Sequence, residues 1–231
     1  MFQKLNSIVI SSVFLTSMLV VAIIVGQASA APNLQLPNSI AKSLGVKWWQ
    51  WAFSFPTDES PLSDTTGERC NEGDQGKIFF LAGTAGPISS TQTRECTISD
   101  KDAIFIPVGN VACIIGHLCA ENTPVANQKE LKEQVTFFAD LIIIHEASVT
   151  IDGQTIELEP ARAQSPVFRT SVVANNPFNE PPTDNGIAYA DGYWVVLRPL
   201  PVGEHTLHFK AVFELGEDDF VTELTYHLTV V

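Results

Sequence analysis

Basic residues are scarce in this sequence of 231 residues. Lysine and arginine total 13 against 26 aspartates and glutamates, which gives a formal net charge of −13 at pH 7. A surface of that sign repels the phosphate backbone of nucleic acids, so we predict that nucleic acid is not a partner. Acidity is also common among exported proteins, and it therefore identifies no specific ligand.

The sequence lacks the short motifs that mark common catalytic and cofactor sites. It contains no Gly-x-Ser-x-Gly nucleophile elbow, no phosphate-binding glycine loop and no Cys-x-x-Cys zinc knuckle. Acidic loops at Asp58, Asp64, Asp184 and residues 217–219 lack EF-hand spacing, so solvated loops are the simpler interpretation and Ca²⁺ binding is the alternative. We predict no catalytic residue, no metal site and no other cofactor.

Only one hydrophobic run is long. Residues 8–25 carry no charge, follow Lys4 and precede Ala28-Ser29-Ala30, which is the order of a cleavable export signal. We predict that residues 1–30 are a signal peptide and that residues 31–231 form a single secreted or cell-surface domain. The run is close to the minimum length for crossing a bilayer, so a retained anchor is the alternative, and only then would the membrane be a partner.

Four cysteines follow the predicted signal. An even number of cysteines in an exported protein indicates disulfides rather than free thiols. We favour the pairs Cys70–Cys96 and Cys113–Cys119, because each joins neighbours along the chain. A zinc site is the rival interpretation.

Two segments have the apolar spacing of amphipathic helices. The first covers residues 38–55, and its apolar stripe consists of Ile40, Leu44, Trp48, Trp51 and Phe55. The second covers residues 127–140, with Leu131, Val135 and Phe138 on one face. We predict that the face with Trp48 and Trp51 packs in the core.

Most of the remaining chain has the alternation and turn residues of β-strands. Asp152-Gly153 favours a hairpin between residues 148–151 and 154–158, and the Pro/Asn-rich residues 175–191 favour a long loop. Many short strands separated by turns predict an antiparallel β-sandwich with about two helices packed on it. The pattern leaves immunoglobulin-like and jelly-roll strand orders open.

The last forty residues predict a three-stranded antiparallel meander. Residues 192–231 contain three alternating segments, and we expect residues 205–215 to pair with 220–230. Side chains three positions apart on a strand point to opposite faces, so His205 and His208 are not expected to bind one metal ion.

Two stretches carry a resemblance to known sequences. They read Asp64-x-Thr-Gly-x-x-Cys-x-x-Gly-x-Gln-Gly76 with Phe80-Leu-Ala-Gly83, and Ala190-Asp-Gly-Tyr-Trp194 with Pro199-Leu200 and Gly203-x-His-Thr206. Together they resemble a group of exported microbial proteins of uncharacterised function, over residues 45–230. The resemblance implies an exported single domain and assigns no catalytic residue. The final hairpin also loosely resembles immunoglobulin-like modules.

Four residues are candidates for ligand binding. Trp49 lies off the apolar stripe of the first helix, so it either widens the apolar face or is exposed, and it is the better candidate of the cluster for an exposed contact with a glycan. His117 lies between Cys113 and Cys119, while Asp64 and Asp191 lie in predicted loops. A pocket that joins Asp64, His117 and Asp191 is the hypothesis to test.

We predict a non-catalytic extracellular binding module whose ligand is a glycan or a protein. One alternative is a secreted hydrolase with Asp64 and Asp191 as its carboxylate pair. Another is an envelope component that assembles with copies of itself. A cleft with two close carboxylates favours the hydrolase, an exposed aromatic strip favours binding, and a large bare apolar patch favours assembly.

Overall fold

The computed structural model describes residues 37–84, 92–119, 123–216 and 218–231, so the predicted signal peptide lies outside the described residues. The elements before the second helix are α1 (Asn38–Ala52), η1 (Cys70–Gly73), β1 (Ile78–Phe80), β2 (Gln92–Ile98) and β3 (Ala103–Ile114). The later elements are α2 (Gln128–Asp140), β4 (Ile142–Ile151), β5 (Gln154–Glu157), β6 (Ala161–Arg162), β7 (Phe168–Val172), β8 (Thr183–Leu197), β9 (Gly203–Leu215) and β10 (Asp218–Val230). No helix among these residues is long and apolar enough to cross a bilayer.

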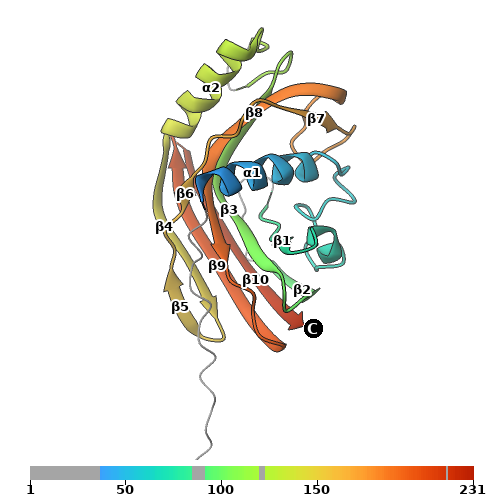
Figure 1. Cartoon of the computed structure of the whole chain (residues 1–231), viewed down its shortest axis with the longest axis vertical. Coiled ribbons are helices and arrows are strands. Elements are labelled where there is room, and N and C mark those ends of the chain that lie inside the picture. The colour runs from blue at the N-terminus through green and yellow to red at the C-terminus, as the bar shows by residue number, and fades with distance from the viewer. Residues whose placement is uncertain (1–36, 85–91, 120–122, 217) are drawn as a thin grey trace, which may run out of the picture.

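The strands form two sheets that pack face to face (Figure 1). Sheet A has the order β1-β3-β8-β6, with β7 also paired to β8, and sheet B has the order β2-β10-β9-β4-β5. This confirms a mostly β sandwich with two helices. Both sheets are mixed rather than wholly antiparallel, because β1 pairs with β3 and β2 with β10 in parallel.

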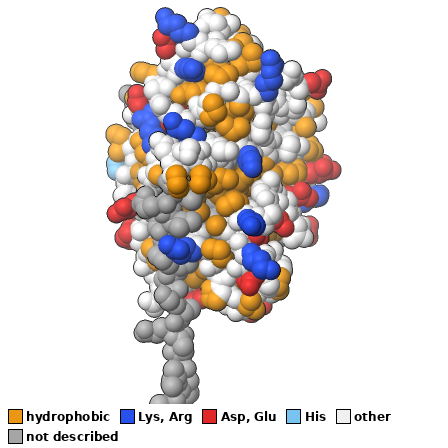
Figure 2. Space-filling view, viewed as in Figure 1, with side chains coloured by type: hydrophobic (Ala, Val, Ile, Leu, Met, Phe, Trp, Pro, Cys, Tyr) orange, Lys and Arg blue, Asp and Glu red, His pale blue; other side chains and the backbone are white. Residues whose placement is uncertain are grey.

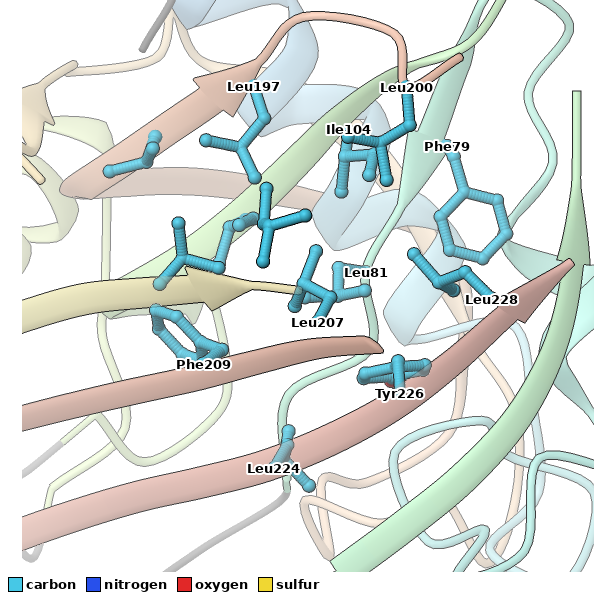
Figure 3. Close-up of a cluster of buried hydrophobic side chains, with 14 of the residues drawn as sticks. Phe79, Leu81, Ile104, Leu197, Leu200, Leu207, Phe209, Leu224, Tyr226 and Leu228 are labelled. Carbon is cyan, nitrogen blue, oxygen red and sulfur yellow. The ribbon is translucent and has the colours of Figure 1, made fainter. Parts of the chain in front are cut away.

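The main core fills the space between the sheets. In Figure 3, side chains from sheet A, such as Ile104 and Leu197, point toward those of sheet B, such as Leu207 and Phe209. The alternation of β9 and β10 places every second side chain in this layer, and Leu207, Leu224 and Leu228 have no solvent exposure. Alternation therefore sets the face that each strand buries.

Helix α1 covers the opposite face of sheet A. It ends at Ala52, three residues before the predicted end, and buries Trp48 and Trp51 as predicted. The Trp48 ring meets Trp194 of β8 edge to face at a centroid distance of 5.6 Å. Trp51 donates its indole N–H to the Glu72 carbonyl at 2.6 Å. The aromatic stripe of α1 thus forms a second core layer.

Helix α2 begins within one residue of its prediction. The side chain of Asn127 caps it by accepting from the backbone N–H groups of Lys129 and Glu130 at 3.0 and 3.1 Å. The helix buries Leu131 and Val135 completely and packs against β8 and β3.

Local predictions for the hairpin and the disulfides are confirmed. Asp152 and Gly153 adopt φ of 50° and 80°, the left-handed values that a tight turn between β4 and β5 requires. The Cα atoms of Cys70 and Cys96 lie 5.6 Å apart, and those of Cys113 and Cys119 lie 5.4 Å apart, within bonding geometry. Two disulfides indicate an oxidising extracellular environment.

Two predictions about the later chain are wrong. The expected loop at residues 175–191 becomes strand from Thr183 onward, because β8 lies between β3 and β7 and hydrogen-bonds to both. The expected three-stranded meander also fails, since β8 belongs to sheet A and the chain crosses to sheet B before β9. The pairing of β9 with β10 is confirmed, with His205 opposite Leu228 and Leu215 opposite Asp218.

Candidate ligand pocket

Asp191 is a structural residue in the middle of β8 rather than a loop residue. Its side chain is fully buried, and its two oxygens accept from Arg162 Nε at 2.9 Å and Nη2 at 2.7 Å. Gln164 donates a third bond at 3.0 Å. Arg162 also pairs with Asp140 of α2 at 2.6 Å, and the bond to Asp191 raises the pKa of Arg162 further above its usual value. This network joins α2 to sheet A.

Asp64 organises its own loop. Its carboxylate accepts from the backbone N–H groups of Thr66 at 2.8 Å, Gly67 at 3.0 Å and Arg69 at 2.8 Å. Partial burial raises the pKa of Asp64, but the bonds from these three N–H groups, with that of the Thr66 hydroxyl, outweigh burial and lower the pKa overall. The carboxylate shapes the chain that leads into Cys70.

His117 has a partner of its own, different from the partners of Asp64 and Asp191. His117 is buried, and its Nδ1 lies 2.8 Å from Glu180 Oε2, which ties the Cys113–Cys119 loop to the chain before β8. The structure therefore gives Asp64, His117 and Asp191 three different local networks. None of them lines the aromatic pocket described below.

Of the two alternatives for Trp49, the structure shows that it widens the apolar face of α1 and is not exposed. Trp49 is only 7% exposed, because the chain before β8 covers this side of α1 as well. The Trp49 ring packs against Phe53 and Phe178 at centroid distances of 5.2 and 5.5 Å. Trp49 nevertheless borders a hollow.

That hollow, called the aromatic pocket here, has a volume of about 260 Å³. It lies where α1, β3 and the β9–β10 hairpin meet. Its key lining residues are Trp48, Trp49, Asn110, Phe178, Phe213 and Phe220. The rest of the described wall consists of leucine, valine, proline, glycine and threonine residues.

A bulge in β3 shapes one wall of the aromatic pocket. The register of β3 against β8 shifts between Pro107 and Gly109. A Cβ atom at Gly109 would lie 3.2 Å from Ile142 Cγ2, a tight contact that would require this side chain to shift by a few tenths of an ångström, and in ordinary contact with the Phe213 ring at 3.5 Å. The bulge lies directly before Asn110, which borders the pocket.

The β9–β10 hairpin supplies the facing wall. Phe213 and Phe220 are directly opposite in the register and stack at a centroid distance of 5.2 Å with nearly parallel rings. Aromatic pairs directly opposite each other stabilise antiparallel strands. The stacked pair therefore holds this wall of the aromatic pocket in place.

The electrostatic character of the aromatic pocket is neutral. Its described lining contains no aspartate, glutamate, histidine, lysine or arginine, although the protein as a whole is strongly acidic. Three buried polar atoms of the lining residues have no hydrogen-bond partner among the described residues: Trp48 Nε1, Trp49 Nε1 and Asn110 Oδ1. Asn110 uses its Nδ2 in a bond of 3.3 Å to the Tyr193 carbonyl. The described lining residues therefore supply no titratable group for acid–base catalysis.

Other parts of the described chain offer no metal centre. No group of three or more histidine, cysteine, aspartate or glutamate side chains there could hold a metal ion. His205 bonds to Asp152 whereas His208 bonds to Thr225 and Glu223, in agreement with their expected opposite faces.

Sequence reasoning missed Asn110, Phe178, Phe213 and Phe220. One signal was present: Gly109 inside an otherwise apolar strand is typical of a bulge, and bulges often border binding sites. The phenylalanines gave no such signal, because alternating aromatic residues in strands are equally typical of a core. Searches with protein-family models and against curated proteins match this chain to nothing.

Proposed function

We propose that this protein is an exported, non-catalytic binding module that holds a small neutral ligand in the aromatic pocket. The observation that carries the proposal is a hollow of about 260 Å³ with apolar, aromatic walls and no titratable side chain in its described lining. Mostly apolar cavities with a few polar groups are typical of small-molecule sites. Export is supported by the signal-like residues 1–30 and by the two disulfides.

The hydrolase alternative receives no support from its two candidate carboxylates. General acid–base catalysis needs a titratable group within reach of the substrate. Asp191 is buried and fully engaged by Arg162 and Gln164, and Asp64 is engaged by backbone N–H groups. Neither lines the aromatic pocket.

Self-assembly through an apolar face also receives no support. Figure 2 shows hydrophobic side chains interspersed with charged ones over the face that carries α1. The large hydrophobic side chains that are exposed, such as Leu118, Phe137 and Val202, come from separate elements of the described chain. A stable interface would need a contiguous patch.

The test uses the mature chain, residues 31–231, with its disulfides intact. Saturation-transfer NMR would measure binding of toluene, indole and naphthalene as neutral probes. We expect saturable binding that is lost when Thr222, which lines the aromatic pocket, is replaced by tryptophan to fill it. Thr97→Trp is the matched control, because it adds the same ring on the exposed side of β2.

Two results would contradict the proposed function. The first is that none of the three probes binds to the folded wild-type protein. The second is that Thr222→Trp binds the probes as tightly as Thr97→Trp does, which would place the binding elsewhere.

A further inference from the structure

Arg94 breaks the pattern of strand β2. Its inward-facing neighbours Cys96 and Ile98 are buried in the main core, and the residues that alternate with them are exposed. Arg94 occupies a core position in the same alternation, with only 1% of the residue exposed. Buried arginines are rare unless a carboxylate pairs with them. In the described part of the chain, no carboxylate lies within ion-pair distance of Arg94.

Four hydrogen bonds hold the guanidinium of Arg94. Its Nη1 donates to the Ala82 carbonyl at 2.8 Å and to the Tyr226 hydroxyl at 2.7 Å. Its Nη2 donates to the Gly83 carbonyl at 3.3 Å and to Gln92 Oε1 at 3.0 Å. The Tyr226 hydroxyl in turn donates to the Ala82 carbonyl at 2.7 Å. Both arms of the planar guanidinium therefore bind main-chain carbonyls of one short segment.

The segment that Arg94 holds is part of the wall of the aromatic pocket. Gly83 and Thr84, which directly follow Ala82, line the pocket. Gly83 also lies against β3, since a Cβ atom added to it would be 3.7 Å from Pro107 Cγ. Arg94 belongs to β2 at the edge of sheet B, whereas this segment follows β1 at the edge of sheet A. The guanidinium therefore ties the two sheet edges together beside the pocket.

The stability of the fold does not account for an arginine at this position. A buried charge without an opposite charge costs free energy, and the Nε–H of Arg94 is also buried without a partner among the described residues. An apolar side chain would continue the alternation of β2 without this penalty. Residues that break a local rule in this way are typical of functional sites. We propose, resting on the proposed function, that Arg94 is a positioning residue that holds Gly83 and Thr84 where ligand binding requires them.

The test measures indole affinity by saturation-transfer NMR and stability by urea unfolding, on the intact mature protein and its variants. Arg94→Lys keeps the charge without the planar fork, and Arg94→Met keeps the stem without any donor. Each should bind indole at least tenfold more weakly than the wild type. Val149→Ala is the control, because it removes buried atoms of the main core outside the described pocket lining, and it should stay within twofold. Wild-type affinity in a folded Arg94 variant, or an equal loss in Val149→Ala at equal stability, would overturn the role of Arg94.

Free guanidinium ion separates positioning from general stability. Arg94→Ala leaves a space beside the Ala82 and Gly83 carbonyls that a guanidinium ion can fill. At concentrations far below those that denature, guanidinium chloride should restore indole affinity to within threefold of the wild type, whereas sodium chloride at equal concentration should not. Guanidinium is a denaturant, so it would weaken binding further if Arg94→Ala acted only through lower stability. Unchanged or weaker binding in its presence would therefore overturn the positioning role.

A spectroscopic readout on the wild-type protein needs no variant to fold. In ¹H–¹⁵N spectra, indole should shift the side-chain signals of Arg94, because the segment that they hold contacts the ligand. Arg162, which is bonded to two aspartates and lies outside the described pocket lining, is the internal control and should not respond. If indole shifts the backbone signal of Thr222 but not the side chain of Arg94, the pocket fills without involving Arg94 and only the positioning role is wrong. If neither responds, the proposed function fails with it.

Discussion

His205 is placed so that only its doubly protonated form satisfies its surroundings. Its side chain is 7% exposed, with Nδ1 at 2.6 Å from Asp152 Oδ2 and Nε2 at 2.9 Å from the Pro201 carbonyl. Both neighbours are acceptors, so each ring nitrogen must carry a proton. Asp152 also accepts from the Thr206 N–H, which keeps this carboxylate fixed against the ring. The imidazolium thus joins the β4–β5 turn to the chain that enters β9.

Raising the pH should weaken this link. Burial lowers the pKa of His205, but its bonds to Asp152 and Pro201 and the charges of Asp152 and Glu204 outweigh burial and raise the pKa overall. A group whose pKa is higher in the folded state stabilises the fold fully below its unfolded pKa of about 6.5 and loses that contribution as the pH rises through the folded value. One charge-assisted hydrogen bond contributes about 1.5–3 kcal/mol. Because Asp152 is partly exposed and screened, we expect a loss of about 1–2 kcal/mol.

Urea unfolding between pH 5.5 and 9 would measure this contribution. The free energy of unfolding of the wild type should exceed that of His205→Gln most at the acid end, and the difference should shrink with rising pH. The other histidines titrate in both proteins, so their contribution drops out of the difference between wild type and variant. A difference that does not change with pH, or a ring spectrum that shows neutral His205 at pH 6.5, would refute the reasoning.

Two further predictions concern the start of the chain and the first helix. Mass spectrometry of the exported protein should find Ala31 at the N-terminus, and intact Met1 confined to membrane fractions would instead indicate a retained anchor. Trp48→Ala should reduce the free energy of unfolding by about 3–5 kcal/mol, since it opens a cavity against Trp194. Denaturant unfolding checks this, with the exposed Gln50→Ala as control, and a loss below about 1 kcal/mol would contradict the core position of Trp48.

Several parts of the fold were predictable because they depend on neighbours along the chain. The cap at Asn127, the turn at Asp152-Gly153 and the short Cys113–Cys119 link all involve residues within a few positions of each other. The register of β9 with β10 is also local, because a short connection and two alternating strands leave few alternatives. The sequence therefore determined both helices, the hairpin, the Cys113–Cys119 link and the last strand pair.

The choice of partners for the other strands came only from tertiary structure. Alternation tells which side chains share a face, but it is the same for a parallel and an antiparallel neighbour. The parallel pairing of β10 with β2 joins residues more than a hundred positions apart. Likewise, nothing in residues 192–215 shows that β8 and β9 enter different sheets. Polar residues before Gly186 are typical of a loop in sequence, although their pairing with β7 makes them part of a strand.

The candidate site depended on tertiary structure most of all. Trp49, Asp64, His117 and Asp191 were selected as chemically capable residues, but the fold engages each of them in packing, capping or ion pairs. The aromatic pocket instead arises where α1, the β3 bulge and the β9–β10 hairpin leave a space between them. An apolar side chain beside a hollow has the same sequence signature as one in a filled core. The sequence determined which side chains are apolar and therefore buried. Only the packing of distant elements decided where a pocket remains between them.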